Sequence, residues 1–206
     1  AFLGQMLVLY LLTLKISEVR KDINQTEYRN RIKELKKIPE LILETLNEEE
    51  KIQLVAKDIY KSKGSMFLGR GFSFPIALEG ALKLKELSYL HAEGYPAGEM
   101  KHGPLALIED GLPVVIVAPK DKYFEKTLSN MQEVISRGGK VLLLTNKESD
   151  VISENIRFKI GLPESDLLLS PFLFTIPLQL LSYHVALLKK CDIDKPRNLA
   201  KSVTVE

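Results

Sequence analysis

Cysteine, tryptophan and histidine are scarce in this sequence of 206 residues, which holds one cysteine, no tryptophan and three histidines. The single thiol, Cys191, excludes an internal disulfide framework and fits a reducing compartment. A zinc site built on cysteine is also excluded, because one thiol and three scattered histidines lack the spacing of a ligand set. We therefore expect no metal site, and we interpret Cys191 as a buried or incidental thiol.

The sequence also lacks an excess of charge of either sign. It has 29 Lys and Arg against 27 Asp and Glu, a formal net charge of +2. The basic residues are spread along the chain, whereas binding to a phosphate backbone needs them gathered on one face. Nucleic acid is not an expected partner.

A long uninterrupted apolar run is missing even from the leucine-rich start, "AFLGQMLVLYLLTLKIS". Gln5 and Lys15 interrupt it, and a membrane span needs about 20 apolar residues. The basic start and small-residue end of a signal peptide are absent. We expect residues 1–17 to be a buried helix from a longer cytoplasmic protein, with no membrane attachment.

The rest of the chain predicts an α/β fold. Residues 18–62 are charged with helical spacing and indicate connector helices. Continuous apolar runs then indicate buried strands at 65–69, 112–119, 140–145 and 156–161, separated by helices from Pro75 to about His91, at 123–137 and at 170–190. This alternation predicts a three-layer, doubly wound parallel sheet with helices on both faces. Residues 192–206 show no periodicity and are expected to form a tail.

The helix "PIALEGALKLKELSYLHAE" carries a polar face. Glu79, Lys83 and Glu86 stand at i, i+4 and i+7 and therefore share one side of it. A solvated stripe with a weak ion pair is the ordinary explanation. Because the helix is otherwise strongly apolar, the polar face can instead meet a cleft.

Two further residues are candidates for chemistry. His102 lies in "EGYPAGEMKHGP", interpreted as a loop at the rim of a site, where Gly103 and Pro104 fix the backbone and a histidine can exchange protons near neutral pH. An ordinary loop histidine is the alternative. Lys201, in "NLAKSVTV", can be desolvated and form a Schiff base, unless the terminus is simply frayed. His91 and His184 fall in helical patterns and are predicted to be packing residues.

Other candidate positions follow from the predicted sheet. Ligands of open parallel sheets bind beyond the carboxyl ends of the strands. "GRGFS" and the loops after "IVAP" and "LLLT" are expected to lie along that rim.

Taken together, "LGRGFSFPIALEGALKLKELSYLHAEGYPAGEMKHGPLALI" and "DKPRNLAKSVTVE" closely resemble the glutamine–fructose-6-phosphate aminotransferase (isomerizing) family. The resemblance extends over essentially the whole chain and is densest in 66–105 and 192–206. It implies the last helix of a first sugar isomerase (SIS) domain at 1–17, connector helices at 18–62, a second SIS domain at 63–191, and a tail at 192–206 that closes the active site.

Residue roles are carried over from matching motifs. The resemblance implies that Glu86 moves a proton between C1 and C2 of the sugar and that Lys201 forms the Schiff base with fructose 6-phosphate. His102 is implied to open the sugar ring in the neighbouring subunit of a homodimer. Lys83 is implied to have a supporting role in catalysis. The implied substrate-binding positions are Glu79 and Ala200.

The implied reaction converts fructose 6-phosphate and glutamine-derived ammonia to glucosamine 6-phosphate, for amino-sugar synthesis. No cofactor is expected, because the carbonyl of the substrate is itself the electrophile. The glutaminase domain and the main phosphate loop of the family lie outside these residues, so the chain alone is expected to be inactive or partly active. Two alternatives stay open: a non-catalytic SIS module that binds sugar phosphates, and a stand-alone isomerase or deaminase.

Overall fold

The computed structural model of the protein describes residues 1–147, 149, 151 and 156–199. Four helices come first: α1 (Phe2–Val19), α2 (Gln25–Leu35), α3 (Ile38–Leu46) and α4 (Glu49–Ile59). The rest of the fold comprises β1 (Gly64–Gly69), α5 (Ser73–Ser88), β2 (His91–Pro96), the 3-10 helices η1 (Ala97–His102) and η2 (Pro104–Leu107), β3 (Pro113–Val117), α6 (Phe124–Ile135), β4 (Lys140–Asn146), β5 (Ile156–Leu162) and α7 (Ser170–Leu188).

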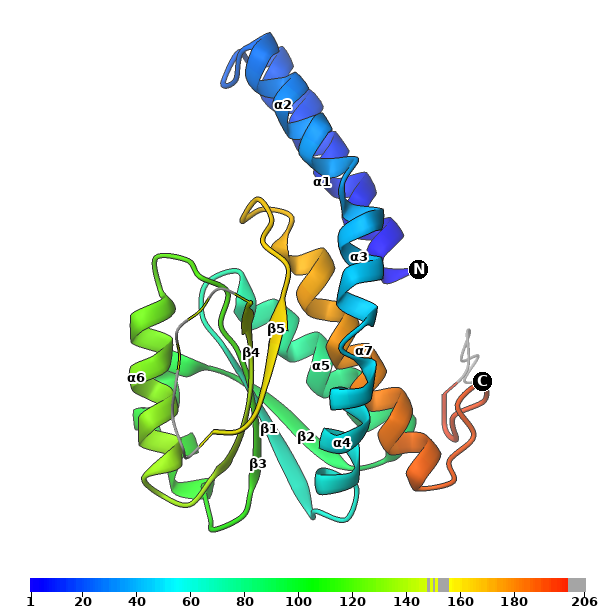
Figure 1. Cartoon of the computed structure of the whole chain (residues 1–206), viewed down its shortest axis with the longest axis vertical. Coiled ribbons are helices and arrows are strands. Elements are labelled where there is room, and N and C mark those ends of the chain that lie inside the picture. The colour runs from blue at the N-terminus through cyan, green and yellow to red at the C-terminus, as the bar shows by residue number, and fades with distance from the viewer. Residues whose placement is uncertain (148, 150, 152–155, 200–206) are drawn as a thin grey trace, which may run out of the picture.

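The five strands form one parallel sheet in the order β2-β1-β3-β4-β5 (Figure 1). Side chains of the central strands alternate between two cores, as the period of a strand requires. On β3, Val115 and Val117 face the core beneath α4, α5 and α7, while Val114 and Ile116 face the core beneath α6 and η1. The predicted three-layer parallel sheet with helices on both faces is confirmed.

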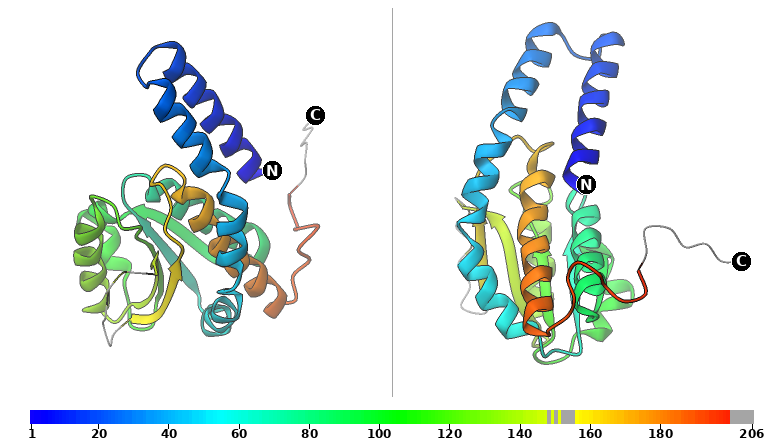
Figure 2. Two further views of the ribbon diagram at one scale, coloured as in Figure 1. Left: turned by 45° about the horizontal axis from the view of Figure 1, so that its top comes forward. Right: turned by 90° about the vertical axis from the view of Figure 1, so that its right-hand side faces the viewer.

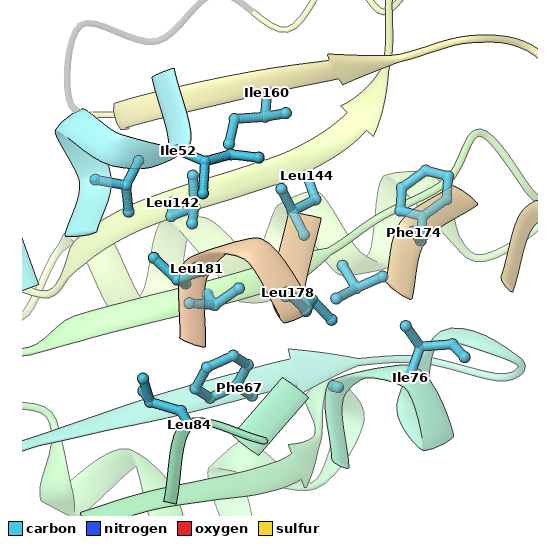
Figure 3. Close-up of a cluster of buried hydrophobic side chains, with 14 of the residues drawn as sticks. Ile52, Phe67, Ile76, Leu84, Leu142, Leu144, Ile160, Phe174, Leu178 and Leu181 are labelled. Carbon is cyan, nitrogen blue, oxygen red and sulfur yellow. The ribbon is translucent and has the colours of Figure 1, made fainter. Parts of the chain in front are cut away.

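Helix α7 supplies the centre of the larger core. In Figure 3, Leu178 and Leu181 of α7 point into a cluster that Phe67 and Leu84 approach from one side and Leu142 from the other. Burial of apolar side chains this complete is the main source of stability of the domain.

The polar start of "HAEGYPAGEMKHGP" is a strand, so the prediction of a loop over residues 93–104 is wrong. Residues 91–96 form β2, which pairs with β1 along its whole length, and 97–102 form η1. A strand at the edge of a sheet tolerates a polar pattern with Gly94 and Pro96, because one side of its backbone makes no ladder. Its neighbour α5 correspondingly ends at Ser88, before His91.

The helices before the sheet divide into two groups. Helices α3 and α4 pack against α7, and Ile52, Val55, Ala56 and Ile59 of α4 belong to the larger core. Helices α1 and α2 form an antiparallel pair that projects from the sheet domain (Figures 1 and 2).

The expectation that residues 1–17 form a buried helix is wrong for this chain. All of α1 is described, and Leu14 is its one buried residue. By length and composition alone, α1 and α7 are both apolar enough to span a membrane. Most of α7 is buried inside the domain, whereas α1 leaves Val8, Leu9, Leu12, Ile16 and Val19 exposed.

Candidate active site on helix α5

Helix α5 brings Glu79, Lys83 and Glu86 together, as their spacing predicts. The Nζ of Lys83 donates a hydrogen bond to Oε2 of Glu86 at 2.6 Å and lies 3.8 Å from Oε1 of Glu79. The side chains are 11% exposed for Glu79, 30% for Lys83 and 27% for Glu86. A fully solvated stripe is therefore the wrong interpretation of this face, because all three groups are largely withdrawn from water.

Glu79 lies at the edge of an apolar cavity. The cavity has a volume of about 440 Å³, and its lining residues are Phe2, Met6, Phe72, Pro75, Ile76, Leu78, Glu79, Leu82 and Pro171. Among the described residues, no hydrogen-bond partner reaches the buried Oε1 of Glu79. Burial raises the pKa of Glu79, Lys83 lowers it and Glu86 raises it, so that the net shift is upward.

Glu86 lies at the opposite end of the sheet from His102. Helix α5 ends just before the first residue of β2, and Glu86 is in its last turn. His102 ends η1, beyond the last residue of β2. A strand of six residues spans roughly 17 Å from its first Cα to its last. Glu86 and His102 of the same chain are therefore too far apart to act on one substrate.

His102 is prominently exposed. Its side chain is 75% exposed, and its Nε2 lies 3.9 Å from Oε2 of Glu99. Gly103, with φ of 141°, separates η1 from η2, and Pro104 begins η2. The imidazole of His102 is therefore accessible at the surface of the described chain.

The prediction that the other two histidines are packing residues is wrong for one of them and right for the other. The prediction that His91 packs inside a helix is wrong, since His91 begins β2 and is exposed, with Nε2 3.2 Å from Oε1 of Glu93. Tyr95 Oη donates to Oε2 of Glu93, and this bond is the main cause that lowers the pKa of Glu93. His184 is buried in α7, as predicted, and its Nε2 lies 2.9 Å from Oε1 of Glu49.

The rim at the carboxyl ends of the strands is a separate region. Arg70 and Gly71 follow β1 there, and the Arg70 guanidinium lies 5.8 Å from the ring centre of Tyr123, which follows β3. Gly71 has φ of 56°, and a Cβ there would lie 2.6 Å from the Tyr123 ring. Glu86, in the last turn of α5, lies at the other end of the strands, so the fold-level rule does not locate it. Glu79, by contrast, lines a cavity together with Phe72, which follows Gly71.

Two predicted residues of the tail, Ala200 and Lys201, lie outside the described residues. The described part of the tail, from Cys191 to Leu199, leaves α7 and runs past α5 (Figure 2). Sequence reasoning missed its contact with Tyr89: the backbone N–H of Arg197 donates to Tyr89 Oη at 2.7 Å. Within the described part of the chain, no group of three or more His, Cys, Asp or Glu side chains is arranged to hold a metal ion.

Known proteins match this chain over its full length. The chain is 50% identical over its full length to glutamine–fructose-6-phosphate aminotransferase (isomerizing) of Bacteroides thetaiotaomicron, and 47% identical to a protein of the same name from Rhizobium meliloti. It spans about a third (34%) of the length of each of these relatives.

A solved structure is similar over most of the chain. It is described as the C-terminal domain of glucosamine-fructose-6-phosphate aminotransferase from Francisella tularensis, and it matches with a TM-score of 0.88 and 43% identity over 91% of this chain and 53% of that one. The family model described as SIS domain matches residues 58–189, nearly two thirds of the chain. This chain therefore belongs to the SIS domain family.

Proposed function

We propose that this chain is the sugar-isomerising part of a glutamine–fructose-6-phosphate aminotransferase. The observation that carries the proposal is the arrangement on α5, where the Glu86 carboxylate is hydrogen-bonded to Lys83 on a largely buried face. Isomerising a ketose to an aldose requires one base that takes a proton from C1 and returns it to C2. A carboxylate held beside a cation suits both steps without a cofactor.

The proposed sequence of steps uses three residues of this chain. The amine of Lys201 adds to the C2 carbonyl of fructose 6-phosphate, and loss of water gives an imine. Ammonia then displaces the lysine, and Glu86 transfers the proton from C1 to C2, which produces glucosamine 6-phosphate. His102 of a second subunit assists ring opening. Lys201 and Ala200 enter this proposal through their motif and the identity with the relatives.

Lys83 and Glu79 support the base. Lys83 donates a hydrogen bond to Glu86 at 2.6 Å, and its Nζ lies 3.8 Å from Glu79, whose pKa is raised by burial.

The same proposal divides the chain into parts of a longer polypeptide of cytoplasmic location. Residues 1–17 are proposed to complete a preceding SIS domain, which would cover the exposed apolar residues of α1. Residues 18–62 would connect the domains, 63–191 would form the second SIS domain, and 192–206 the closing tail. Hydrogen exchange tests this division: amides of α1 that exchange equally fast in the 206-residue chain and in the longer polypeptide contradict it.

Covalent trapping tests the activity itself. The full-length protein is incubated with fructose 6-phosphate, reduced with borohydride, digested and analysed by mass spectrometry. A hexitol phosphate on Lys201 is the expected product. Sugar phosphate that binds without an adduct on Lys201 would instead indicate a binding module and overturn the proposed chemistry.

A further inference from the structure

The short helix that carries His102 depends on its surroundings for its position. Helix η1 has 3-10 geometry, in which the internal hydrogen bonds are poorer than those of an α-helix. Ala97 and Met100 of η1 are 1% and 0% exposed and belong to the core beneath α6, whereas Lys101 and His102 are exposed. This helix thus has a buried side and an outer end that presents the histidine.

Asn130 of α6 joins the two helices at the start of η1. Its side chain is buried. In the amide orientation that satisfies its neighbours, Nδ2 donates to the carbonyl of Ala97 at 3.1 Å and to the carbonyl of Lys126 at 3.0 Å. One amide therefore connects the main chain of η1 to the main chain of α6. Hydrogen bonds are directional, so this contact fixes the orientation of η1 as well as its distance from α6.

Glu133 reaches the other end of η1 from the same helix. Its Oε1 lies 3.1 Å from Nζ of Lys101, the residue before His102, and its side chain is 21% exposed. Asn130 and Glu133 stand at i and i+3, so they lie on one side of α6. An ion pair with an exposed lysine is weak, which makes Glu133 the lesser of the two contacts.

The middle of η1 is covered by Arg70, the residue after β1. A Cβ at Gly98 would lie 3.2 Å from Cζ and Nη1 of Arg70, so glycine allows the guanidinium to approach the backbone of η1 closely. Helix η1 is therefore held along its length, and Gly103, with φ of 141°, follows its last residue. His102 consequently combines an exposed side chain with a backbone that its neighbours hold in place.

We propose that Asn130 and Glu133 are positioning residues: by holding η1 on α6, they set the direction in which His102 reaches the site of a second subunit. This inference rests on the function proposed above, in which His102 assists ring opening. Neither residue is assigned a contact with the sugar. Their loss should therefore lower kcat, while KM for fructose 6-phosphate stays the same.

Two variants of the full-length protein test the two contacts. Asn130→Ala removes the donor to Ala97, and we expect kcat to fall about tenfold, because a small misplacement of a reacting group slows a reaction strongly. Glu133→Gln keeps the shape and loses the ion pair, and should lower kcat by about threefold. Gln132→Ala, which removes an exposed amide of the same helix, is the matched control and should react like the unaltered protein.

Subunit mixing separates positioning from general damage to the fold. Asn130→Ala protein is mixed with an equal amount of Glu86→Gln protein under conditions that exchange subunits. One site of each mixed dimer then receives Glu86 from the first chain and a correctly held His102 from the second. Activity should rise about fivefold above the sum for the unmixed proteins. Mixing Asn130→Ala with His102→Asn should give no rise, because neither chain then supplies a well-placed histidine.

The outcomes distinguish this inference from the function on which it rests. A rise with His102→Asn and none with Glu86→Gln would place the damage in the variant chain's own site and overturn the positioning role. A kcat of Asn130→Ala within about twofold of the unaltered protein overturns it as well. If Asn130→Ala does not fold, Glu133→Gln is mixed in the same way, and an absence of its expected rise of about twofold with Glu86→Gln contradicts the proposal. No rise when His102→Asn is mixed with Glu86→Gln is a different result, which overturns the shared site of the proposed function instead.

Discussion

Lys83 lies between two carboxylates and forms a hydrogen bond with one of them. Its Nζ is 2.6 Å from Oε2 of Glu86 but 3.8 Å from Oε1 of Glu79, which is too long for a hydrogen bond. The two acids thus have unequal environments on one helical face. Glu86 has a direct cationic partner, whereas Glu79 is the more buried and has a raised pKa. Unequal environments of this kind allow two carboxyl groups to take different roles.

The first prediction concerns Glu86 as the base. Glu86→Gln keeps the shape and removes the group that accepts a proton, so we expect kcat for glucosamine 6-phosphate formation to fall by about 10²–10⁴-fold. The adduct on Lys201 should still form, because that step precedes proton transfer between the carbons. Steady-state kinetics and borohydride trapping measure the two steps separately.

Glu50→Gln, on the exposed side of α4, is the control for loss of one negative charge. Retention of more than a tenth of the activity in Glu86→Gln would remove Glu86 from this role.

The second prediction concerns the pH dependence of stability at Glu79. Burial raises the pKa of Glu79 above its ordinary value of 4.5, so the folded chain holds this proton more tightly than the unfolded chain does. The contribution of Glu79 to stability is therefore fully present below the ordinary pKa and is lost as pH rises through the folded pKa.

Glu79→Gln removes this titration. In urea unfolding of the 206-residue chain, the variant should be more stable than the parent by about 1 kcal/mol near pH 7.5, and the difference should shrink near pH 3.5. Glu50→Gln serves again as the control and should show no such trend. A Glu79→Gln variant that is less stable than the parent at the higher pH would show that the charge of Glu79 is satisfied in the folded chain.

The third prediction concerns the close packing that places α5. A Cβ at Gly80 would lie 2.8 Å from Cδ1 of Leu178 and 3.0 Å from ring atoms of Phe67, so this glycine allows α5 to approach both α7 and β1. Gly80→Ala should destabilise the chain by about 1–3 kcal/mol through overpacking. Gly4→Ala is the matched control, since a Cβ there meets no atom within 4 Å and should leave stability unchanged or slightly raised.

A double-mutant cycle tests the stated cause of that loss. Leu178→Ala alone should cost about 2–5 kcal/mol by leaving a cavity. Because the added methyl of Gly80→Ala would partly fill this cavity, the double variant should be less destabilised than the sum of the single changes. Strictly additive free energies from chemical denaturation would show that Leu178 is not the residue that opposes the methyl group.

The buried strands were predictable because all of their side chains face an apolar core. Strands β1, β3 and β4 are covered on both faces, and their unbroken apolar runs indicated this directly. Strand β2 was missed because an edge strand keeps polar residues such as His91 and Glu93, which resemble a loop pattern.

The arrangement of the candidate site was predictable where it depends on local spacing and not where it depends on distant contacts. Glu79, Lys83 and Glu86 meet because helical periodicity places them together. The contact between Tyr89 and Arg197 joins residues 108 positions apart in the sequence and requires a left-handed tyrosine. Neither the pairing nor that backbone conformation has a signature in residue order, because propensity would assign the left-handed position to glycine.

The last prediction concerns a site shared between subunits. His102 is exposed beyond one end of β2, while Glu86 lies near the other end, so a second copy of the chain is the expected source of the histidine. We mix full-length His102→Asn protein with full-length Lys201→Ala protein, each inactive alone, under conditions that exchange subunits. In a mixed dimer, one of the two sites receives an intact His102 from one chain and an intact Lys201 from the other. With random exchange, half of the dimers are mixed and each has one working site, so about a quarter of the parental activity should return. Mass spectrometry of the intact complex should verify that mixed dimers have formed, and a persistent lack of activity in them would place His102 and Lys201 in the same chain's site.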